Sequence, residues 1–293
     1  MFRYAVSNWI FGDEPLEKTY SRLRKTGFDA IELVGEPERY NPDQIIRLNS
    51  KYKLSVVSIL AWCLWPMEER DLAHCNDGMR EKAVNYICRN IDLAGAVGAS
   101  IVVVIPGPAG RTVPHGSSGG PKEWQAAAAG EWKRAVDSVR AAACYAQDKG
   151  ITLAVEPINR FESFLLNSAA QGARFIEEVG LSNVKLHLDT FHMNIEEACI
   201  TAAVKENAAR LVNMHLSDSN RCAIGRGHFN FRELFKALTQ IQYMGALVLE
   251  PLPPHPNPFI ACKLEQFRSR WDQDLEESMN YLRSLEEEVR AGG

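Results

Sequence analysis

The sequence predicts a single (β/α)8 TIM barrel, and three observations support this fold class. The chain has 293 residues, which suits a barrel of roughly 250 residues with insertions. Eight short apolar, β-branched segments alternate with longer segments of helical periodicity. The order turn glycine, strand, glutamate recurs in KTGFDAIE, DKGITLAVE and YMGALVLE. We therefore predict one α/β TIM-barrel domain over residues 1–293.

The eight predicted strands follow one another along the whole chain. They are RYAVS (3–7), DAIELV (29–34), LSVVSIL (54–60), SIVVVI (100–105), ITLAV (151–155), VKLHL (184–188), LVNMHL (211–216) and ALVLE (246–250). Such continuous apolar runs are typical of parallel strands that are buried on both faces, and closure into a barrel leaves no sheet edge. An open doubly wound sheet is the alternative, but no GxGxxG motif follows the first strand.

The segments between the strands predict helices and two long rim loops. Residues 80–97 and 130–147 carry apolar side chains at i, i+3 and i+4, as helices that pack one face on a sheet do. The last helix, about residues 262–289, is expected to close the outer ring. The glycine-rich loop 106–121 and the proline-rich loop 251–258 each follow a strand. We expect both on the rim where barrels carry their active sites.

Composition argues against several classes of partner. Thirty-three basic and 37 acidic residues give a formal net charge of -4, and without a basic block we expect no nucleic-acid partner. The sequence starts in a strand-like segment, and no apolar run approaches membrane-spanning length, so we expect neither a secretory leader nor a membrane partner. Seven cysteines without CxxC spacing favour reduced thiols and a cytoplasmic location. A small neutral or weakly charged ligand suits this chain.

The last four predicted strands end at polar residues that are expected to share one site. Glu156, Asp189, His215 and Glu250 stand at the ends of strands five to eight, and a barrel brings such neighbours to the same mouth. Each residue alone could be a helix cap, half of an ion pair or a core histidine. Three clustered carboxylates, however, repel one another unless a cation joins them.

The ligand set indicates the kind of cation. Three oxygen ligands and one nitrogen suit a six-coordinate divalent ion better than structural zinc, which takes more cysteine or histidine ligands. We expect one divalent ion, with Mn²⁺ preferred and Co²⁺ or Mg²⁺ as alternatives, and no organic cofactor. Two coordination positions would remain for substrate oxygens.

Three further residues follow these strand ends on the predicted loops. Glu162, His192 and Arg221 lie six, three and six residues beyond Glu156, Asp189 and His215. They would offer an acceptor, a switchable donor and a fixed cation to substrate hydroxyls. The alternative interpretation is that they are ordinary solvated loop charges.

The motifs around these residues resemble those of a known family. They are EPINRFE (156–162), HLDTFHMNIEE (187–197), HLSDSNR (215–221), GRGH (225–228) and LEP (249–251). With them the sequence resembles the D-tagatose 3-epimerase group, which includes the D-psicose (allulose) and L-ribulose 3-epimerases, within the xylose-isomerase-like barrel superfamily. The likeness covers nearly the whole chain and is strongest from about residue 150 to 251.

The resemblance implies an activity and a role for each site residue. The activity would be that of a metal-dependent ketose 3-epimerase, an isomerase that inverts C3 of free ketohexoses and ketopentoses through a metal-bound cis-enediolate. Glu156, Asp189, His215 and Glu250 would be the metal ligands. Glu156 and Glu250 would also be the catalytic acid/base pair, and Glu162, His192 and Arg221 would hold the carbonyl end of the substrate. Such barrels usually form homo-oligomers, here a dimer or tetramer, and the outer tryptophans Trp124, Trp132 and Trp271 are compatible with association.

Two departures from the compact epimerases keep other functions open. The loop 111–120 is longer and more glycine-rich than the resemblance implies, and the loop 251–258 reshapes the rim after the last strand. The same scaffold and metal site also resemble those of a lyase on 3-keto sugars, such as a C-glycoside-cleaving catalytic subunit with a small partner subunit, or of a dehydratase. An aldose-ketose or hydroxypyruvate isomerase is a further alternative. A DNA-repair nuclease of the endonuclease IV kind would need more histidines than seven and a basic face. A noncatalytic sugar-binding protein would not require the full ligand set.

Overall fold

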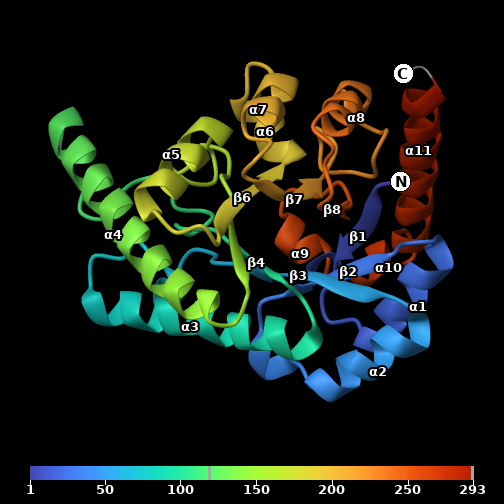
Figure 1. Cartoon of the computed structure of the whole chain (residues 1–293), viewed down its shortest axis with the longest axis horizontal. Helices are drawn as coiled ribbons and strands as arrows, with labels where there is room; N and C mark the ends of the chain where they lie inside the picture. Colours follow the sequence, from blue (N-terminus) through green and yellow to red (C-terminus); the bar gives the residue numbers. More distant parts are fainter. Residues whose placement is uncertain (118–119, 292–293) are drawn as a thin grey trace.

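Eight parallel strands form a closed barrel in the part of the chain that the computed structural model describes, residues 1–117 and 120–291 (Figure 1). The strands are β1 (Arg3–Ser7), β2 (Ala30–Val34), β3 (Ser55–Ala61), β4 (Ile101–Val104), β5 (Thr152–Val155), β6 (Val184–Asp189), β7 (Leu211–Leu216) and β8 (Ala246–Leu249). The predicted fold class is confirmed, and each predicted strand end lies within one residue of the observed one. The domain range of 1–293 stays a prediction, since residues 118–119 of the rim loop and 292–293 lie outside the described residues.

The strand register brings particular side chains to the same level of the barrel. Strand β1 closes the barrel by pairing with β8, with Arg3 opposite Ala246. Between β6 and β7 the pairing places Asp189 opposite His215. The register shifts at Ile31/Glu32 and at Leu186/His187. Both irregularities therefore lie beside buried polar residues at the centre of the site described below.

Alternation along β6 shows how a buried strand carries polar groups. Leu186 packs outward against α5, where a Cβ added to Gly172 would lie 2.6 Å from its Cδ1 atom. Because side chains of a strand alternate between faces, His187 and Asp189 point into the barrel, and both are fully buried. The outward-facing side chains of β6 therefore form part of the apolar layer beneath the helices, and its inward-facing side chains supply polar groups to the inside of the barrel.

The helices surround the barrel in chain order. They are α1 (Leu16–Thr26), α2 (Pro42–Tyr52), α3 (Asp77–Val97), α4 (Pro121–Gln147), α5 (Ala169–Val179), α6 (Thr190–Glu196), α7 (Ile200–Glu206), α8 (Phe231–Gln240) and α11 (Trp271–Ala291), with the short α9 and α10 given below. Among the described residues, none of these helices combines the length and apolar character needed to cross a membrane.

Two predicted helices start earlier than expected because their caps lie upstream. The predicted helices 80–97 and 130–147 end where α3 and α4 end, but α3 begins at Asp77 and α4 at Pro121. The Asn76 side chain accepts a hydrogen bond from the backbone N–H of Met79 at 3.1 Å. Proline favours the first turn of a helix, and the Glu123 carboxylate accepts from the backbone N–H of Gly120. These polar first turns lack the apolar periodicity on which the prediction depended.

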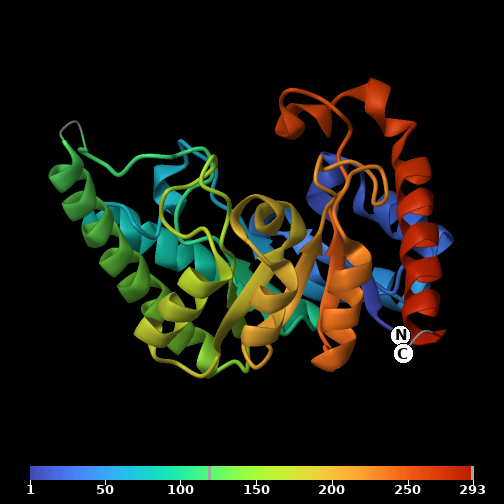
Figure 2. The ribbon, with the colours of Figure 1, turned by 90° about the horizontal axis from the view of Figure 1, so that it is seen from above.

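The prediction of one C-terminal helix over 262–289 is wrong. The segment forms α9 (Pro258–Ala261), α10 (Glu265–Arg268) and α11, which begins only at Trp271. Trp271 is buried and packs edge to face on Phe11 at 5.3 Å between ring centroids, so tertiary packing breaks the periodic run. Helix α11 still closes the ring between α8 and α1. Figure 2 shows the segment before it arching over one end of the barrel, the end on which α4 also begins.

Gly35, directly after β2, allows a close approach of neighbouring parts of the chain near this end of the barrel. A Cβ there would lie 2.7 Å from the Leu60 carbonyl oxygen and 2.8 Å from the Tyr86 hydroxyl. We expect Gly35→Ala to lower the free energy of unfolding by about 1–3 kcal/mol through overpacking, measured by urea denaturation. In the matched control, Gly95→Ala in α3, the added methyl meets nothing within 4 Å and should stabilise by up to about 1 kcal/mol. Equal stability of the two variants would contradict the close approach.

Candidate active site

The four predicted strand-end residues meet at the mouth of the barrel. Asp189 and His215 are paired across β6 and β7. Glu156 and Glu250 directly follow β5 and β8, and their backbone N–H groups donate to the carbonyl oxygens of Val104 and Leu216 at 3.0 and 3.1 Å. All four side chains are buried. The parallel hydrogen-bond pattern of the sheet therefore continues one residue beyond β5 and β8, and it fixes the backbone of both glutamates.

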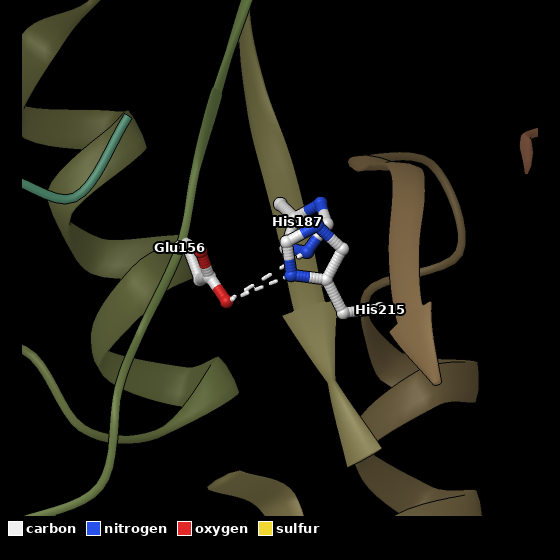
Figure 3. Close-up of side chains that lie close together, drawn as sticks. All are labelled: Glu156, His187 and His215. Carbon is white, nitrogen blue, oxygen red and sulfur yellow. Dashed lines mark ion pairs between the residues drawn. The ribbon is translucent and has the colours of Figure 1, made fainter. Parts of the chain in front are cut away.

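His215 lies at the centre of this cluster. Its Nδ1 atom is 3.4 Å from Glu156 Oε1 and 3.6 Å from Glu250 Oε2, and Figure 3 shows Glu156 and the His215 ring facing each other. The Nη2 atom of Arg221 lies 3.0 Å from Asp189 Oδ2 and 3.2 Å from Glu250 Oε2. One imidazole and one guanidinium thus link all three carboxylates.

The predicted substrate-binding residues surround the same space. His192 Nε2 lies 3.6 Å from Asp189 Oδ2, and its Nδ1 atom accepts the backbone N–H of Asn159 at 3.2 Å. The Asn159 amide also donates to Glu162 Oε1 at 3.0 Å. Glu162 and His192, from the loops after β5 and β6, are thereby joined through one asparagine.

Arg221 reaches the cluster from an unusual backbone conformation. Its φ is 57°, in the left-handed region that costs a residue with a side chain about 1–3 kcal/mol and often marks functional sites. Its backbone N–H donates to the Asp218 carbonyl at 2.8 Å, and its carbonyl accepts from Leu252 at 2.6 Å. The loops after β7 and β8 together hold this arginine over the site.

A cavity of about 430 Å³, which includes space open to solvent, lies over the cluster. Its polar lining is Glu156, Glu162, His192, His215, Arg221 and Glu250, and its aromatic lining is Trp9, Trp62 and Phe259. Asp189 is not part of the lining and lies behind Arg221. Six of the seven predicted site residues therefore face one cavity.

Burial and neighbouring charges shift the protonation of the carboxyl groups. Burial, together with the Glu250 and Glu156 carboxylates, raises the pKa of Asp189 to about 7, although Arg221 and His215 oppose the shift. Burial also raises the pKa of Glu250, with help from Glu32 and Glu156. These two acids therefore hold their protons to a higher pH than exposed carboxyls do.

The three histidines of the site respond in opposite directions. Burial would lower the pKa of His215, but Glu250, Glu32 and Glu156 together raise it well above its ordinary value. Burial lowers the pKa of His187, and His215 lowers it further. Burial and Arg221 likewise lower the pKa of His192. His215 is thus the cationic imidazole of the cluster, while His187 and His192 are neutral.

The side chains of the site suit a metal ion, but the ligand atoms of the four predicted ligands do not all lie close enough together to form one group. Three overlapping groups have ligand atoms within 4.8 Å of one another: Glu156, His187 and His215; Glu32, His215 and Glu250; Glu156, Asp189 and His192. Each predicted ligand belongs to at least one group. Carboxylate oxygens with imidazole nitrogen are ligands that divalent first-row ions accept, and a cation would relieve the repulsion among these buried acids.

Two central residues were not predicted from the sequence. Glu32 on β2 is fully buried, lies 3.0 Å from His215 Nε2 and accepts the Ser58 hydroxyl at 2.6 Å. His187 stacks edge to face on His215 at 4.0 Å between centroids and lies 3.8 Å from Glu156 Oε1 (Figure 3). Among the described residues neither ring nitrogen of His187 has a hydrogen-bond partner. The sequence did carry a signal for both residues, since each is a polar side chain inside an apolar strand. Burying such a side chain without a partner is costly, so its presence there predicts a buried polar partner.

Trp9 is a third residue that the sequence did not indicate. It lies in the short helix η1 (Asn8–Phe11) after β1. Its indole N–H donates to Glu250 Oε1 at 2.6 Å, and its ring stacks near Phe259 at 5.7 Å between centroids. One side chain thus orients a buried carboxylate and supplies part of the cavity wall.

Comparison with known proteins identifies the family. The model of the xylose isomerase-like TIM barrel family matches residues 20–285, so the chain belongs to this family. It is 32% identical over 255 residues to an L-ribulose 3-epimerase of Mesorhizobium japonicum, covering 85% of this chain and 81% of that protein. A D-psicose 3-epimerase of Agrobacterium fabrum is 43% identical over 123 residues, 42% of this chain and 43% of that protein.

Structural comparison agrees with the sequence relationships. The solved structure of an L-ribulose 3-epimerase matches with a TM-score of 0.84 and 27% identity, covering 100% of this chain and 97% of the other. The predicted relationship to the ketose 3-epimerases is confirmed, and so is the prediction of an isomerase of the sugar isomerase and epimerase superfamily. The roles of individual site residues stay predictions.

The contact between Glu32 and His215 generates a stability test. Glu32→Ala leaves the Nε2 atom of the buried His215 imidazolium without its partner and the Ser58 hydroxyl without its acceptor, so we expect a loss of about 3 kcal/mol in the free energy of unfolding. Glu32→Gln keeps the side-chain shape and should lose less. Urea denaturation with a chelator present measures both variants. The exposed Glu287→Ala is the control and should stay within about 0.5 kcal/mol of the unsubstituted protein; an equally mild effect of Glu32→Ala would refute the buried pairing.

Proposed function

We propose that this protein is a metal-dependent ketose 3-epimerase that acts on free ketohexoses and ketopentoses. The observation that carries the proposal is the pair of buried carboxylates, Glu156 and Glu250, whose oxygens lie 3.4 and 3.6 Å from the same nitrogen of His215 at one cavity. The names of the relatives, L-ribulose 3-epimerase and D-psicose 3-epimerase, support a sugar substrate and the reaction at C3.

The proposal includes one divalent ion held by Glu156, Asp189, His215 and Glu250, with Mn²⁺ preferred over Co²⁺ or Mg²⁺. The overlapping groups of ligand atoms within 4.8 Å support it. When bound, such an ion stabilises negative charge on oxygen and so acidifies the carbon beside a carbonyl. Arg221 now lies between Asp189 and Glu250 and provides part of the same charge compensation.

Glu156 and Glu250 would be the acid/base pair. They follow β5 and β8, which are separated by β6 and β7 in the barrel, so the two carboxyl groups approach a bound sugar from different sides. One would take the proton from C3 on one face, and the other would return a proton on the opposite face of the enediolate. General acid/base catalysis typically contributes about 10²- to 10⁴-fold to the rate. Burial raises the pKa of Glu250, and its carboxylate accepts a hydrogen bond from Trp9, so it is an oriented group that can take up a proton more readily than an exposed carboxylate.

Glu162, His192 and Arg221 would hold the carbonyl end of the substrate. Burial keeps His192 neutral, so it can donate one hydrogen bond while its other nitrogen accepts one. Arg221 supplies a permanent positive charge beside the developing oxyanion. The aromatic rings of Trp9, Trp62 and Phe259 would cover the sugar and exclude water.

We further propose that the enzyme works in the cytoplasm as a homo-oligomer, without a nucleic-acid or membrane partner. Its seven cysteines are all free thiols, and Cys75, Cys144 and Cys199 are exposed, which suits a reducing compartment. Exposed apolar side chains such as Trp124 and Phe161 suit association. The suggested contribution of Trp271 to such a surface is wrong, because that ring is buried against Phe11.

Glu156→Gln and Glu250→Gln test the acid/base assignment. Each amide keeps the shape of the carboxyl but cannot take up the proton, so in D2O deuterium exchange at C3 should fall at least about 100-fold for the epimer, D-fructose or D-psicose, whose C3 proton faces the changed residue. NMR measures the exchange, and circular dichroism checks the fold. The exposed Glu206→Gln serves as a matched control and should exchange normally. Normal exchange in Glu156→Gln would remove that residue from the pair.

Metal loading should depend on pH through Asp189. Its pKa is raised to about 7, so its proton competes with the metal below that pH, because ligands must be deprotonated. After chelation, Mn²⁺ should therefore raise Tm more at pH 8 than at pH 5. In the metal-free protein, the folded state holds the Asp189 proton more tightly than the unfolded state does. The resulting contribution to stability is fully present at low pH and is lost as pH rises through about 7. Differential scanning calorimetry measures both effects, and Asp189→Asn should abolish most of the pH difference; an equal Mn²⁺ shift at both pH values would contradict the assignment.

A further inference from the structure

The two nitrogens of the His215 ring face different carboxylates. Nδ1 lies 3.4 Å from Glu156 Oε1 and 3.6 Å from Glu250 Oε2. Nε2 lies 3.0 Å from Glu32 Oε1. Glu156, His215 and Glu250 are among the described residues that line the active-site cavity, whereas Glu32 is buried outside that lining. One edge of the ring is therefore directed at the proposed ligands, and the other edge is directed at a carboxylate that a substrate in the cavity does not reach.

Glu32 is held in place by side chains of the barrel interior. The strand register places Glu32 of β2 opposite Ser58 of β3, and the Ser58 hydroxyl donates to Glu32 Oε2 at 2.6 Å. The side-chain amide of Asn213 donates to the same hydroxyl oxygen at 3.3 Å, so the hydroxyl proton is directed at the carboxylate. All three side chains are fully buried. Since Ser58 occupies Oε2, Oε1 is the oxygen that accepts from His215 Nε2.

His187 restricts the same imidazole from another side. Its ring lies edge to face on the His215 ring, with 4.0 Å between centroids, and Figure 3 shows the two rings packed together. A half-turn of the His215 ring about its bond to Cβ would move both nitrogens away from their carboxylates. Contacts with Glu32 and His187 both oppose such a turn, so the ring is fixed in orientation before any ion binds.

The contact with Glu32 also selects the nitrogen that is free to bind a metal. A neutral imidazole carries its proton on one ring nitrogen and a lone pair on the other, and a metal binds the lone pair. A carboxylate accepts hydrogen bonds and does not donate them, so Glu32 favours the tautomer with the proton on Nε2. The lone pair is then on Nδ1, which faces Glu156 and Glu250. Histidines that bind metals commonly donate their other N–H to a carboxylate in this way.

Glu32 suits this supporting position better than a ligand position. It does belong to one of the three groups of neighbouring ligand atoms, with His215 and Glu250. Its two oxygens, however, already accept from His215 and Ser58. An ion bound at Glu32 would also be separated from the cavity in which a substrate binds, because Glu32 is not part of the described lining.

From this geometry we propose that Glu32 is a positioning residue of the metal site. It fixes the tautomer and the orientation of His215 so that Nδ1, and not Nε2, binds the divalent ion. Ser58 supports Glu32 in this role. The inference rests on the metal site of the proposed function, and it gives Glu32 an effect on metal affinity in addition to its contribution to stability.

NMR with ¹¹³Cd²⁺ as the probe identifies the binding nitrogen in the unsubstituted protein labelled with ¹⁵N-histidine. One-bond coupling between ¹¹³Cd and ¹⁵N occurs only at a nitrogen that binds the ion, and correlations with the ring protons distinguish Nδ1 from Nε2. After assignment of the seven histidine rings, we expect this coupling at Nδ1 of His215 and a proton on its Nε2. Coupling at Nε2 of His215, or no coupling at His215 in protein that binds the ion, would overturn the inference.

Titration calorimetry of chelator-treated protein with Mn²⁺ measures the effect of Glu32 on affinity. Glu32→Ala should raise the Kd at least about tenfold, as loss of an outer partner of a metal ligand typically does. Glu32→Gln should lose less affinity, because its amide oxygen can still accept the Nε2 proton. Gly35→Ala is the control for destabilisation alone. Its added methyl would contact Leu60, Asn90 and Tyr86 rather than the His215 ring, so its Kd should stay unchanged.

The outcomes separate this inference from the proposed function. If the unsubstituted protein binds none of Mn²⁺, Co²⁺ and Mg²⁺, the proposed metal site itself is refuted. If it binds Mn²⁺ and Glu32→Ala binds it equally well, the inference is wrong and the proposed function stands. A loss in Glu32→Gln as large as that in Glu32→Ala would also count against a role through the hydrogen bond. If Glu32→Ala does not fold, the nitrogen identified by ¹¹³Cd²⁺ decides.

Discussion

The compensation of buried negative charge at the mouth of the barrel is the constraint on which the rest of this structure depends. Glu156, Asp189 and Glu250 converge there from three strands, and Glu32 faces them from β2. Isolated carboxylates in such a setting would be neutralised or would destabilise the fold. The parallel barrel brings these four acidic residues together. Their negative charge then requires positive charge beside them.

His215 and Arg221 meet that constraint in different ways. His215 is fixed on β7 and contacts Glu32 through Nε2 and both Glu156 and Glu250 through Nδ1. Arg221 comes from a loop and depends on a left-handed backbone that Asp218 and Leu252 hold in place. The two cations that balance the buried carboxylates therefore come from different kinds of element, a strand and a loop.

A buried ion cluster anchors the rim loop after β4. Arg111, in the loop after β4, is buried and contacts Asp71 and Glu131 at 2.8 Å each. This ion cluster links that loop to the segment before α3 and to α4, because Glu131 lies in that helix. The same loop includes Ala109 and Gly110, which line a pocket on the rim. A buried ionic anchor of this kind is costly to break once formed, so it holds this loop in place.

Sequence patterns were enough to predict the eight strands, the closed parallel barrel and the seven polar residues at the strand ends and in the following loops. Hydrophobic periodicity, apolar runs and turn glycines are local properties of the chain and can be read from it directly. A barrel then brings all strand ends together, whatever their distance along the chain. Three features could be seen only in the folded chain: Glu32 pairs with His215, 183 positions away, His187 stacks on the same ring, and the C-terminal segment breaks before Trp271. These contacts depend on strand register, barrel closure and loop conformation. A local pattern records which face a side chain occupies, but not which side chain meets it there.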